Sequence, residues 1–294
     1  MKSRNKHISI YKIISTILLV IMAILFLFPL YWIITGAFKT GADIYADKVI
    51  WFPREWTFKN FELMLNKRTS PLFEIFGIRG PVGPAAYRWL INTVVMSVGA
   101  MALTCITASM AGYALAKKRF RGRGIIFGLI VCAMALPKQV ILIPLLKEMA
   151  ALNLTNTLWA VILPTVGWPF GVFLMKQFSE SIPGEMLEAA RIDGAGELRT
   201  FNTVVLPLVK PGIGALAIFT FINAWNDYFM QLVMLSSNEQ YTISMGISTL
   251  MGESTIDMGV LMAGSTLAAA PIILVFLIFQ KNFTQGITMG AVKG

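Results

Sequence analysis

Six apolar segments, separated by polar segments, run along this chain, and each is long enough to cross a bilayer. Crossing the hydrocarbon core takes about 20 predominantly apolar residues. Four segments contain no charged residue, whereas the third contains Lys138 and the fifth contains Asp227. The pattern predicts an all-α, polytopic membrane protein with six transmembrane helices. They are expected at Ile13–Phe38, Trp89–Ala116, Gly124–Leu146, Leu158–Met175, Gly212–Leu235 and Met258–Phe279.

Prolines inside two of these segments predict interrupted helices. Proline removes a backbone donor and clashes with the preceding helical turn. The third segment contains Pro137 and Pro144, so we expect its helix to break at both residues. The stretch LIPLLKEMAALNL that follows is then expected to lie along the membrane interface. The fourth segment has only 18 residues and contains Pro169.

The basic residues between the segments predict the orientation. With the N-terminus inside, the inner segments hold 15 basic and five acidic residues, whereas the outer segments hold nine of each. Basic residues gather on the cytoplasmic side of membrane proteins. We therefore expect both termini in the cytoplasm and the following organisation: an N-terminal tail (1–12), a first span (13–38), an outer cap (39–88), a core (89–280) with a long inner loop (176–211), and a C-terminal tail (281–294).

Composition excludes several classes of protein. Hydrophobic residues make up 56% of the chain and charged residues 14%, whereas an ordinary globular domain has about 25% charged residues. The net charge of +10 lies on the inner side, most densely in KKRFRGR (Lys117–Arg123). This placement favours anionic lipid over nucleic acid as the partner. Cys105 and Cys132 lie in apolar segments and are expected to be packed thiols, and the single histidine, His7, excludes a histidine-rich metal or catalytic site.

The long inner loop contains the stretch EAARIDGAGELRTFNTVVLPLVKP, from Glu188 to Pro211. Ser181 and Pro183 predict a helix start, so we expect a short helix over Glu185–Arg191. Gly194 is expected to form a left-handed corner.

A second, amphipathic helix is expected after this corner, with Phe201, Val204, Val205 and Leu208 on its apolar side. Pro207 and Pro211 are expected to break it before the fifth span. A helix pair with small residues and acids suits docking into a groove of a cytosolic protein. The five acids of the inner loop (176–211) argue against its lying on anionic lipid, which would repel them.

The spacing EAA, three residues, Gly194, nine residues, Val204, one residue, Leu206-Pro207 resembles the signature of bacterial ABC importer permeases, EAA-x3-G-x9-I-x-LP. Val204 replaces the usual isoleucine. The resemblance implies that this loop couples the permease to an ATP-binding subunit. The residues that carry over are Glu188, Ala189, Ala190, Asp193, Gly194, Leu206 and Pro207.

Further stretches, among them LPKQVILIPL, NLTNTLWAVILP, WNDY and GAVKG, are similar to the carbohydrate branch of this family, the six-span permeases of the maltose-transporter type. The resemblance covers nearly the whole chain except an insertion at about residues 66–86. It implies a type I importer permease fold and a subunit of an ATP-driven oligosaccharide importer in a bacterial cell membrane. The implied partners are a second, homologous permease, two ATP-binding subunits, an extracellular or periplasmic solute-binding protein, and the sugar.

No phosphate-binding loop is present, since the sequence contains no Gly-Lys dipeptide. We therefore expect no enzyme activity and no cofactor on this chain, with ATP and magnesium held by the partner ATPase. Three alternatives stay open: a six-helix secondary transporter or channel, a membrane receptor or scaffold, and, within the family, a glycerol-phosphate importer.

The stretch NAWNDYF carries the second group of candidate residues, Asn223, Trp225, Asn226 and Asp227. On a continuous helix, Asp227 lies about 24 Å from Pro211, and Asn223 shares its face. A carboxylate facing lipid is costly, so Asp227 is expected to face the bundle or a wet cavity. Either these residues line the sugar path, or they bind another helix.

Overall fold

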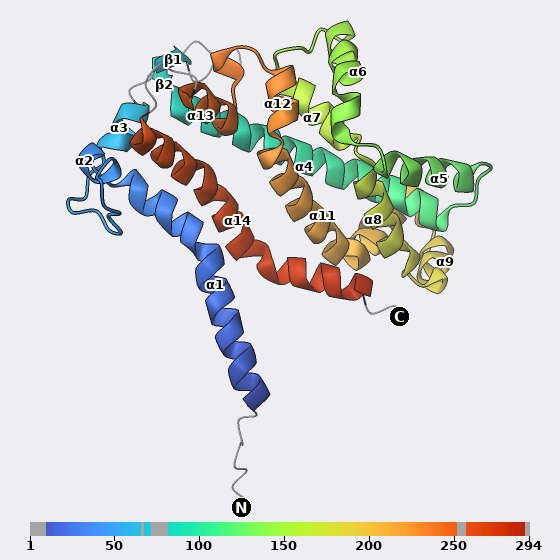
Figure 1. The fold of residues 1–294 in the computed structure, drawn as a ribbon. Coiled ribbons are helices and arrows are strands. Elements are labelled where there is room, and N and C mark those ends of the chain that lie inside the picture. Colours follow the sequence, from blue (N-terminus) through green and yellow to red (C-terminus); the bar gives the residue numbers. More distant parts are fainter. Residues whose placement is uncertain (1–9, 66–67, 72–81, 252–256, 292–294) are drawn as a thin grey trace, which may run out of the picture. The chain divides into compact units, whose positions relative to one another are not determined.

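The computed structural model describes residues 10–65, 68–71, 82–251 and 257–291. The chain forms two compact units, of which the first contains residues 1–67 and 250–267 and the second contains residues 68–249 and 268–294. The regular structure of the described residues is almost entirely helical, as predicted (Figure 1). The strands β1 (Arg68–Pro71) and β2 (Val82–Pro84) form a short antiparallel hairpin.

The first unit is organised around α1 (Ile10–Ala37), which is apolar and has an uncovered surface over its most hydrophobic part. Such a helix needs lipid or another membrane protein around it. The short helices α2 (Gly41–Ile44) and α3 (Lys59–Leu65) follow. A Cβ atom at Gly36 would lie 2.1 Å from the sulfur of Met262, so glycine permits the close approach of α1 to the first turns of α14 (Met258–Ala291).

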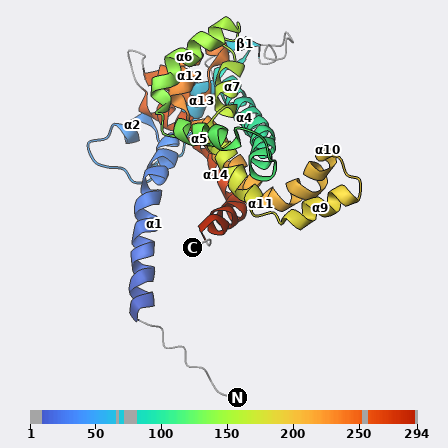
Figure 2. The same cartoon turned by 90° about the vertical axis from the view of Figure 1, so that its right-hand side faces the viewer.

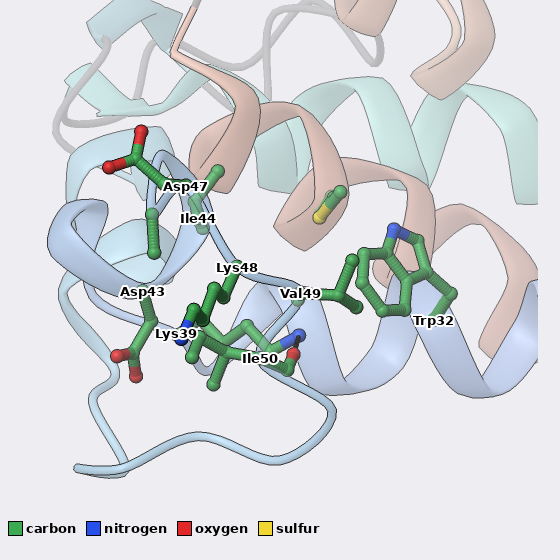
Figure 3. Close-up of a pocket in the computed structure, with 11 residues that line it drawn as sticks. Trp32, Lys39, Asp43, Ile44, Asp47, Lys48, Val49 and Ile50 are labelled. Atoms are coloured by element: carbon green, nitrogen blue, oxygen red, sulfur yellow. Dashed lines mark hydrogen bonds between the residues drawn. The ribbon is translucent and has the colours of Figure 1, made fainter.

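A cavity of about 140 Å³ lies at the C-terminal end of α1 in this unit (Figure 3). Lys39 is only 2% exposed, donates a hydrogen bond to the carbonyl of Ile50 at 2.5 Å, and lies 4.2 Å from the ring centre of Trp32. Tyr31 likewise donates to the carbonyl of Trp51 at 2.6 Å. Ligand pockets usually enclose about 300 Å³ or more, so we read this cavity as the place where the segment after α2 is fastened to α1.

The second unit is built around α4 (Ala85–Lys117), which packs most extensively against α8 (Pro169–Glu180) and α11 (Leu206–Asn226), and also against α7 (Trp159–Val166). Its other helices include α5 (Arg123–Met134), α6 (Lys138–Ala151), α9 (Gly184–Ile192), α10 (Glu197–Thr200), α12 (Tyr228–Met234) and α13 (Ile243–Met251), with a π-helical turn at Phe201–Val205 and a 3₁₀ turn at Asn238–Gln240.

Small residues allow the helices of the second unit to approach closely, as is common between transmembrane helices. A Cβ atom at Gly112 of α4 would lie 2.6 Å from the backbone nitrogen of Lys176 and 2.6 Å from the carbonyl carbon of Met175. At Gly171 of α8, a Cβ atom would meet Ala108 of α4 at 3.1 Å. The α4–α8 contact therefore brings the two backbones together.

Two buried apolar clusters are found among the described residues of the second unit. One joins α4 and α7 to α6 and α12, and includes Met96, Ala160, Val161 and Met234. The other joins α4, α8 and α11 to α9, through residues that include Tyr113, Met175, Leu187, Phe201 and Leu216. The second cluster attaches the inner loop to the spans.

Among the residues that the structure describes, four helices are long and apolar enough to cross a membrane, and two bent pairs can each count as one further span. The bent pairs are α5 with α6, at 110°, and α7 with α8, at 40°. The break at Pro137 is where we predicted it, because Lys138 begins α6. The predicted break at Pro144 is wrong: this proline lies inside α6, where it removes a single backbone hydrogen bond and the helix continues.

Candidate functional site

The inner loop forms a helix–corner–helix that projects from the rest of the second unit beside the start of α11 (Figure 2). The predicted helix over Glu185–Arg191 is confirmed, with α9 spanning Gly184–Ile192 after the extended residue Pro183. Leu187 and Ala190 are buried, whereas Glu188 and Ala189 are exposed. One face of α9 therefore packs on the spans and the opposite face is open.

Gly194 makes the predicted left-handed corner, with φ of +76°. The amide of Gly194 donates to the carbonyl of Arg191, and the amide of Ala195 donates to that of Ala190 at 2.9 Å. This pair of bonds ends the helix in the arrangement that favours glycine at its left-handed position. The corner is therefore fixed by backbone hydrogen bonds, with Asp193 exposed beside it.

Two apolar residues at the tip were missed in the sequence. Ile192 is 86% exposed at the end of α9, and Leu198 is 68% exposed on α10. Both are bulky apolar residues among charged neighbours, a pattern that could have indicated a contact surface. From the sequence we considered only the glycine in this corner. Together with exposed carboxylates such as that of Glu188, these two side chains offer both charged and apolar contacts to a groove on another protein.

The second helix differs from the prediction because Pro207 and Pro211 do not break it. The helix continues from Glu197 to Asn226 through a π-helical turn, in which the amide of Leu206 donates to the carbonyl of Phe201. The wider turn lies just before Pro207, where an α-helical turn would bring the proline ring against a carbonyl. Leu206 and Pro207 thus begin α11 directly.

Only part of the expected apolar side of this second helix is covered. Phe201 and Val205 are buried and Val204 is half-buried, whereas Leu208 is exposed.

The fifth span is interrupted at Asp227, which corrects the continuous helix that we predicted. α11 ends at Asn226, and the carboxylate of Asp227 accepts a hydrogen bond from the amide of Met230 to begin α12. Aspartate favours this capping position. Asn223 and Asp227 therefore do not share one helix face.

Asp227 forms an ion pair with Lys138, with 3.2 Å between the side-chain nitrogen and oxygen. These are the two charges that the sequence placed inside spans. The ammonium group also lies 4.8 Å from the ring centre of Trp168, which precedes α8. Three helix breaks of the second unit therefore meet through these side chains. Lys138 lies at the break between α5 and α6, Trp168 at the break between α7 and α8, and Asp227 at the break between α11 and α12. Apart from the rarity of charged residues within the spans, nothing in the sequence indicated that these two side chains pair.

The other candidate residues near this break have different surroundings. Trp225 is 1% exposed and packs against Phe221, with 5.5 Å between ring centres. Asn223 and Asn226 are exposed, and each donates its side-chain amide to the carbonyl four residues earlier, at 2.8 and 2.9 Å. The amide oxygens of both asparagines are left to accept hydrogen bonds from outside the helix.

The family model described as "Binding-protein-dependent transport system inner membrane component" matches residues 106–289. The arabinooligosaccharides transport system permease protein AraQ of Bacillus subtilis (strain 168) is 32% identical over 296 residues, covering 100% of both chains. The melibiose/raffinose/stachyose import permease protein MelC of the same organism is 32% identical over 284 residues, covering 96% of both chains.

A similar fold is found in a solved structure, a chain of a bacterial ABC transporter involved in the import of the acidic polysaccharide alginate. The TM-score is 0.77 at 23% identity, and the match covers 96% of this chain and 99% of that chain.

Proposed function

Because this chain belongs to the family of binding-protein-dependent transport system inner membrane components, we propose that it is the permease subunit of an ATP-driven importer of oligosaccharides. Its relatives at 32% identity over their full or nearly full lengths are named as permeases for oligosaccharides. The observation that carries the proposal is the exposed helix–corner–helix with the EAA sequence on α9 and Gly194 at its corner.

The proposed partners are a homologous second permease, two ATP-binding subunits and a solute-binding protein outside the membrane. The sequence lacks a phosphate-binding loop, so ATP and magnesium are assigned to the ATP-binding subunits. The family description names a binding protein as the component on which transport depends.

The proposed mechanism is alternating access driven through the inner loop. Closure of the ATP-binding subunits moves the helix pair α9–α10 that is seated in their groove. Glu188 supplies a charge-assisted contact to the groove, and Gly194 sets the corner. Leu206 and Pro207 pass the movement into α11, so that the spans turn from inward-facing to outward-facing.

We propose that the sugar path runs along the face of α11 that carries Asn223 and Asn226. Exposed amides in an apolar membrane helix are costly against lipid, and their free oxygens suit the hydroxyl groups of a saccharide. Trp225 is buried inside this chain, and Asp227 is engaged by Lys138, so neither has a side chain directed to a ligand here. Contact with the second permease is the competing role for the two asparagines.

The first test combines uptake with charge reversal at Glu188. Proteoliposomes containing the whole complex should take up arabinotriose or raffinose only with internal ATP. Glu188→Lys should lower uptake and ATPase association about tenfold, within the usual range for coupling between sites. Glu185→Lys, an equal charge change one turn earlier on the exposed surface of α9, is the control. ATP-independent uptake would refute the importer assignment, and normal coupling in Glu188→Lys would refute the role of this residue.

The second test concerns the orientation, with both termini in the cytoplasm. In a protein lacking Cys105 and Cys132, cysteines placed at Arg121 and Arg199 should react with impermeant thiol reagents only from the inside. A cysteine at Ser236 should react only from the outside. Labelling of position 199 from outside would reverse the topology and place the helix pair on the wrong side for an ATP-binding partner.

A further inference from the structure

Two lysines at the end of α4 contact the helix pair α9–α10, one at the entry to α9 and one at the start of α10. Lys117, the last residue of α4, donates to the carbonyls of Glu180 at 3.1 Å and Ile182 at 2.6 Å, where the chain leaves α8. Carbonyls at a helix end lack partners within the helix and attract a cation. Lys117 therefore fastens α4 to the segment that enters α9.

Lys118 reaches the other side of the corner. Its ammonium group forms an ion pair with Glu197, the first residue of α10. Arg191, in the last turn of α9, lies on the same carboxylate with 3.8 Å between charged atoms. Glu197 is thus shared by a cation from α4 and a cation from α9, and the three groups link α4 to both helices of the pair.

Aromatic contacts extend this link toward the π-helical turn. The Lys118 ammonium lies 5.2 Å from the ring centre of Tyr113, one turn earlier on α4. Tyr113 in turn contacts Phe201, the first residue of the π-helical turn, with 5.7 Å between ring centres, and both rings are buried. The end of α4 therefore touches the inner loop at its entry, its corner and its exit.

These contacts contribute little to the free energy of unfolding, so their role is to hold the inner loop in position on α4. The side chain of Glu197 is 65% exposed and that of Lys118 is 27% exposed, and exposed ion pairs add little to the free energy of unfolding. The covalent route from α10 to α11 passes through a π-helical turn, a type of turn often found at functional sites. A second, non-covalent connection to the longest helix of the unit would make the transmission of movement less dependent on that turn.

We propose that Lys118, together with Lys117, is a positioning residue that couples movement of the inner loop to α4, so that the ATP-binding partner moves α4 as well as α11. This inference rests on the proposed function of the inner loop. It also gives the basic segment KKRFRGR a role in the protein itself, beyond attraction to anionic lipid.

The test is a charge exchange in the complete complex. Lys118→Glu and Glu197→Lys should each lower sugar uptake per ATP hydrolysed about fivefold, the lower end of coupling between sites. Protein yield and thermal stability should stay unchanged. The double variant Lys118→Glu/Glu197→Lys should recover most of the coupling, and Lys118→Arg should retain it. Arg119→Glu makes the same charge change at the adjacent exposed residue and should have no effect.

The outcomes separate this inference from the proposed function. A wild-type complex without ATP-dependent uptake of arabinotriose or raffinose would remove the proposed function and the inference with it. Normal coupling in Lys118→Glu alongside an active wild type would overturn only the inference. A loss of yield equal to the loss of uptake, or a failure of the double variant to recover, would also overturn it, because the pair would then be a structural contact or no contact at all.

Discussion

Replacing Gly112 by valine is expected to abolish accumulation of folded protein in the membrane. The added atoms would meet the backbone of α8, since a Cβ at this position already lies 2.6 Å from the nitrogen of Lys176. A neighbouring side chain can rotate away, but the backbone of a packed helix cannot move without separating α4 from α8. Gly112→Ala should fold with reduced stability, since overpacking costs about 1–3 kcal/mol. Detergent-extracted yield and thermal denaturation measure both effects.

Gly128 of α5 is the matched control for this experiment. A Cβ atom at Gly128 would meet no atom within 4 Å, so Gly128→Ala and Gly128→Val should leave yield nearly unchanged. Equal yields of Gly112→Val and Gly128→Val would show that the backbones of α4 and α8 do not approach each other as closely as in this structure.

Removing one member of the Lys138–Asp227 pair should also have a large effect. Lys138→Met leaves the carboxylate of Asp227 without its cation in the membrane region, and an uncompensated buried charge costs up to about 3–5 kcal/mol. The partial exposure of both side chains reduces this cost. We expect a clear loss of yield and melting temperature in Lys138→Met. The double variant Lys138→Met/Asp227→Asn should be milder than Lys138→Met alone, because asparagine keeps the helix cap and removes the charge.

The same variants distinguish a structural role for the pair from a role in the sugar path. Asp227→Asn with normal yield but an altered preference between arabinotriose and raffinose would place Asp227 in the path. Lower yield with an unaltered preference supports a structural junction of the three helix breaks. A double variant as damaged as Lys138→Met alone would contradict charge compensation as the cause.

The features that could be predicted from the sequence are those determined by residues adjacent in the chain. The start of α9 after Pro183 and the corner at Gly194 are local backbone effects, and both were predicted. The role of Asp227 was predicted wrongly because an aspartate in an apolar segment has two possible structural roles. It can be a costly charge inside a continuous helix, or it can cap the start of a new helix, as it does here. Its partner could not be predicted, since Lys138 is 89 residues away in the chain and the two meet only when three interrupted spans pack together.

The prolines show a second limit of reading a sequence locally. Pro137 ends a helix and Pro144 does not, although both were read with the same rule. Pro207 is accepted because the turn before it is wider, and that turn has no residue signature that we recognised. The six apolar segments and the all-α class follow directly from hydrophobicity, whereas interruptions within a segment depend on tertiary contacts.

The π-helical turn at Phe201–Val205 also sets the rotational phase of α11. A π-helical turn holds about one residue more than an α-helical turn, and one residue corresponds to about 100° of rotation. The face with Asn223 and Asn226 is therefore turned by that angle, relative to the corner at Gly194, from where an uninterrupted α-helix would put it. If the extra residue migrated along the helix, the residues that it passed would turn by about 100° relative to both the corner and the face with Asn223 and Asn226, so a side chain at the start of α11 could exchange its neighbours while the backbone ladder stayed largely intact.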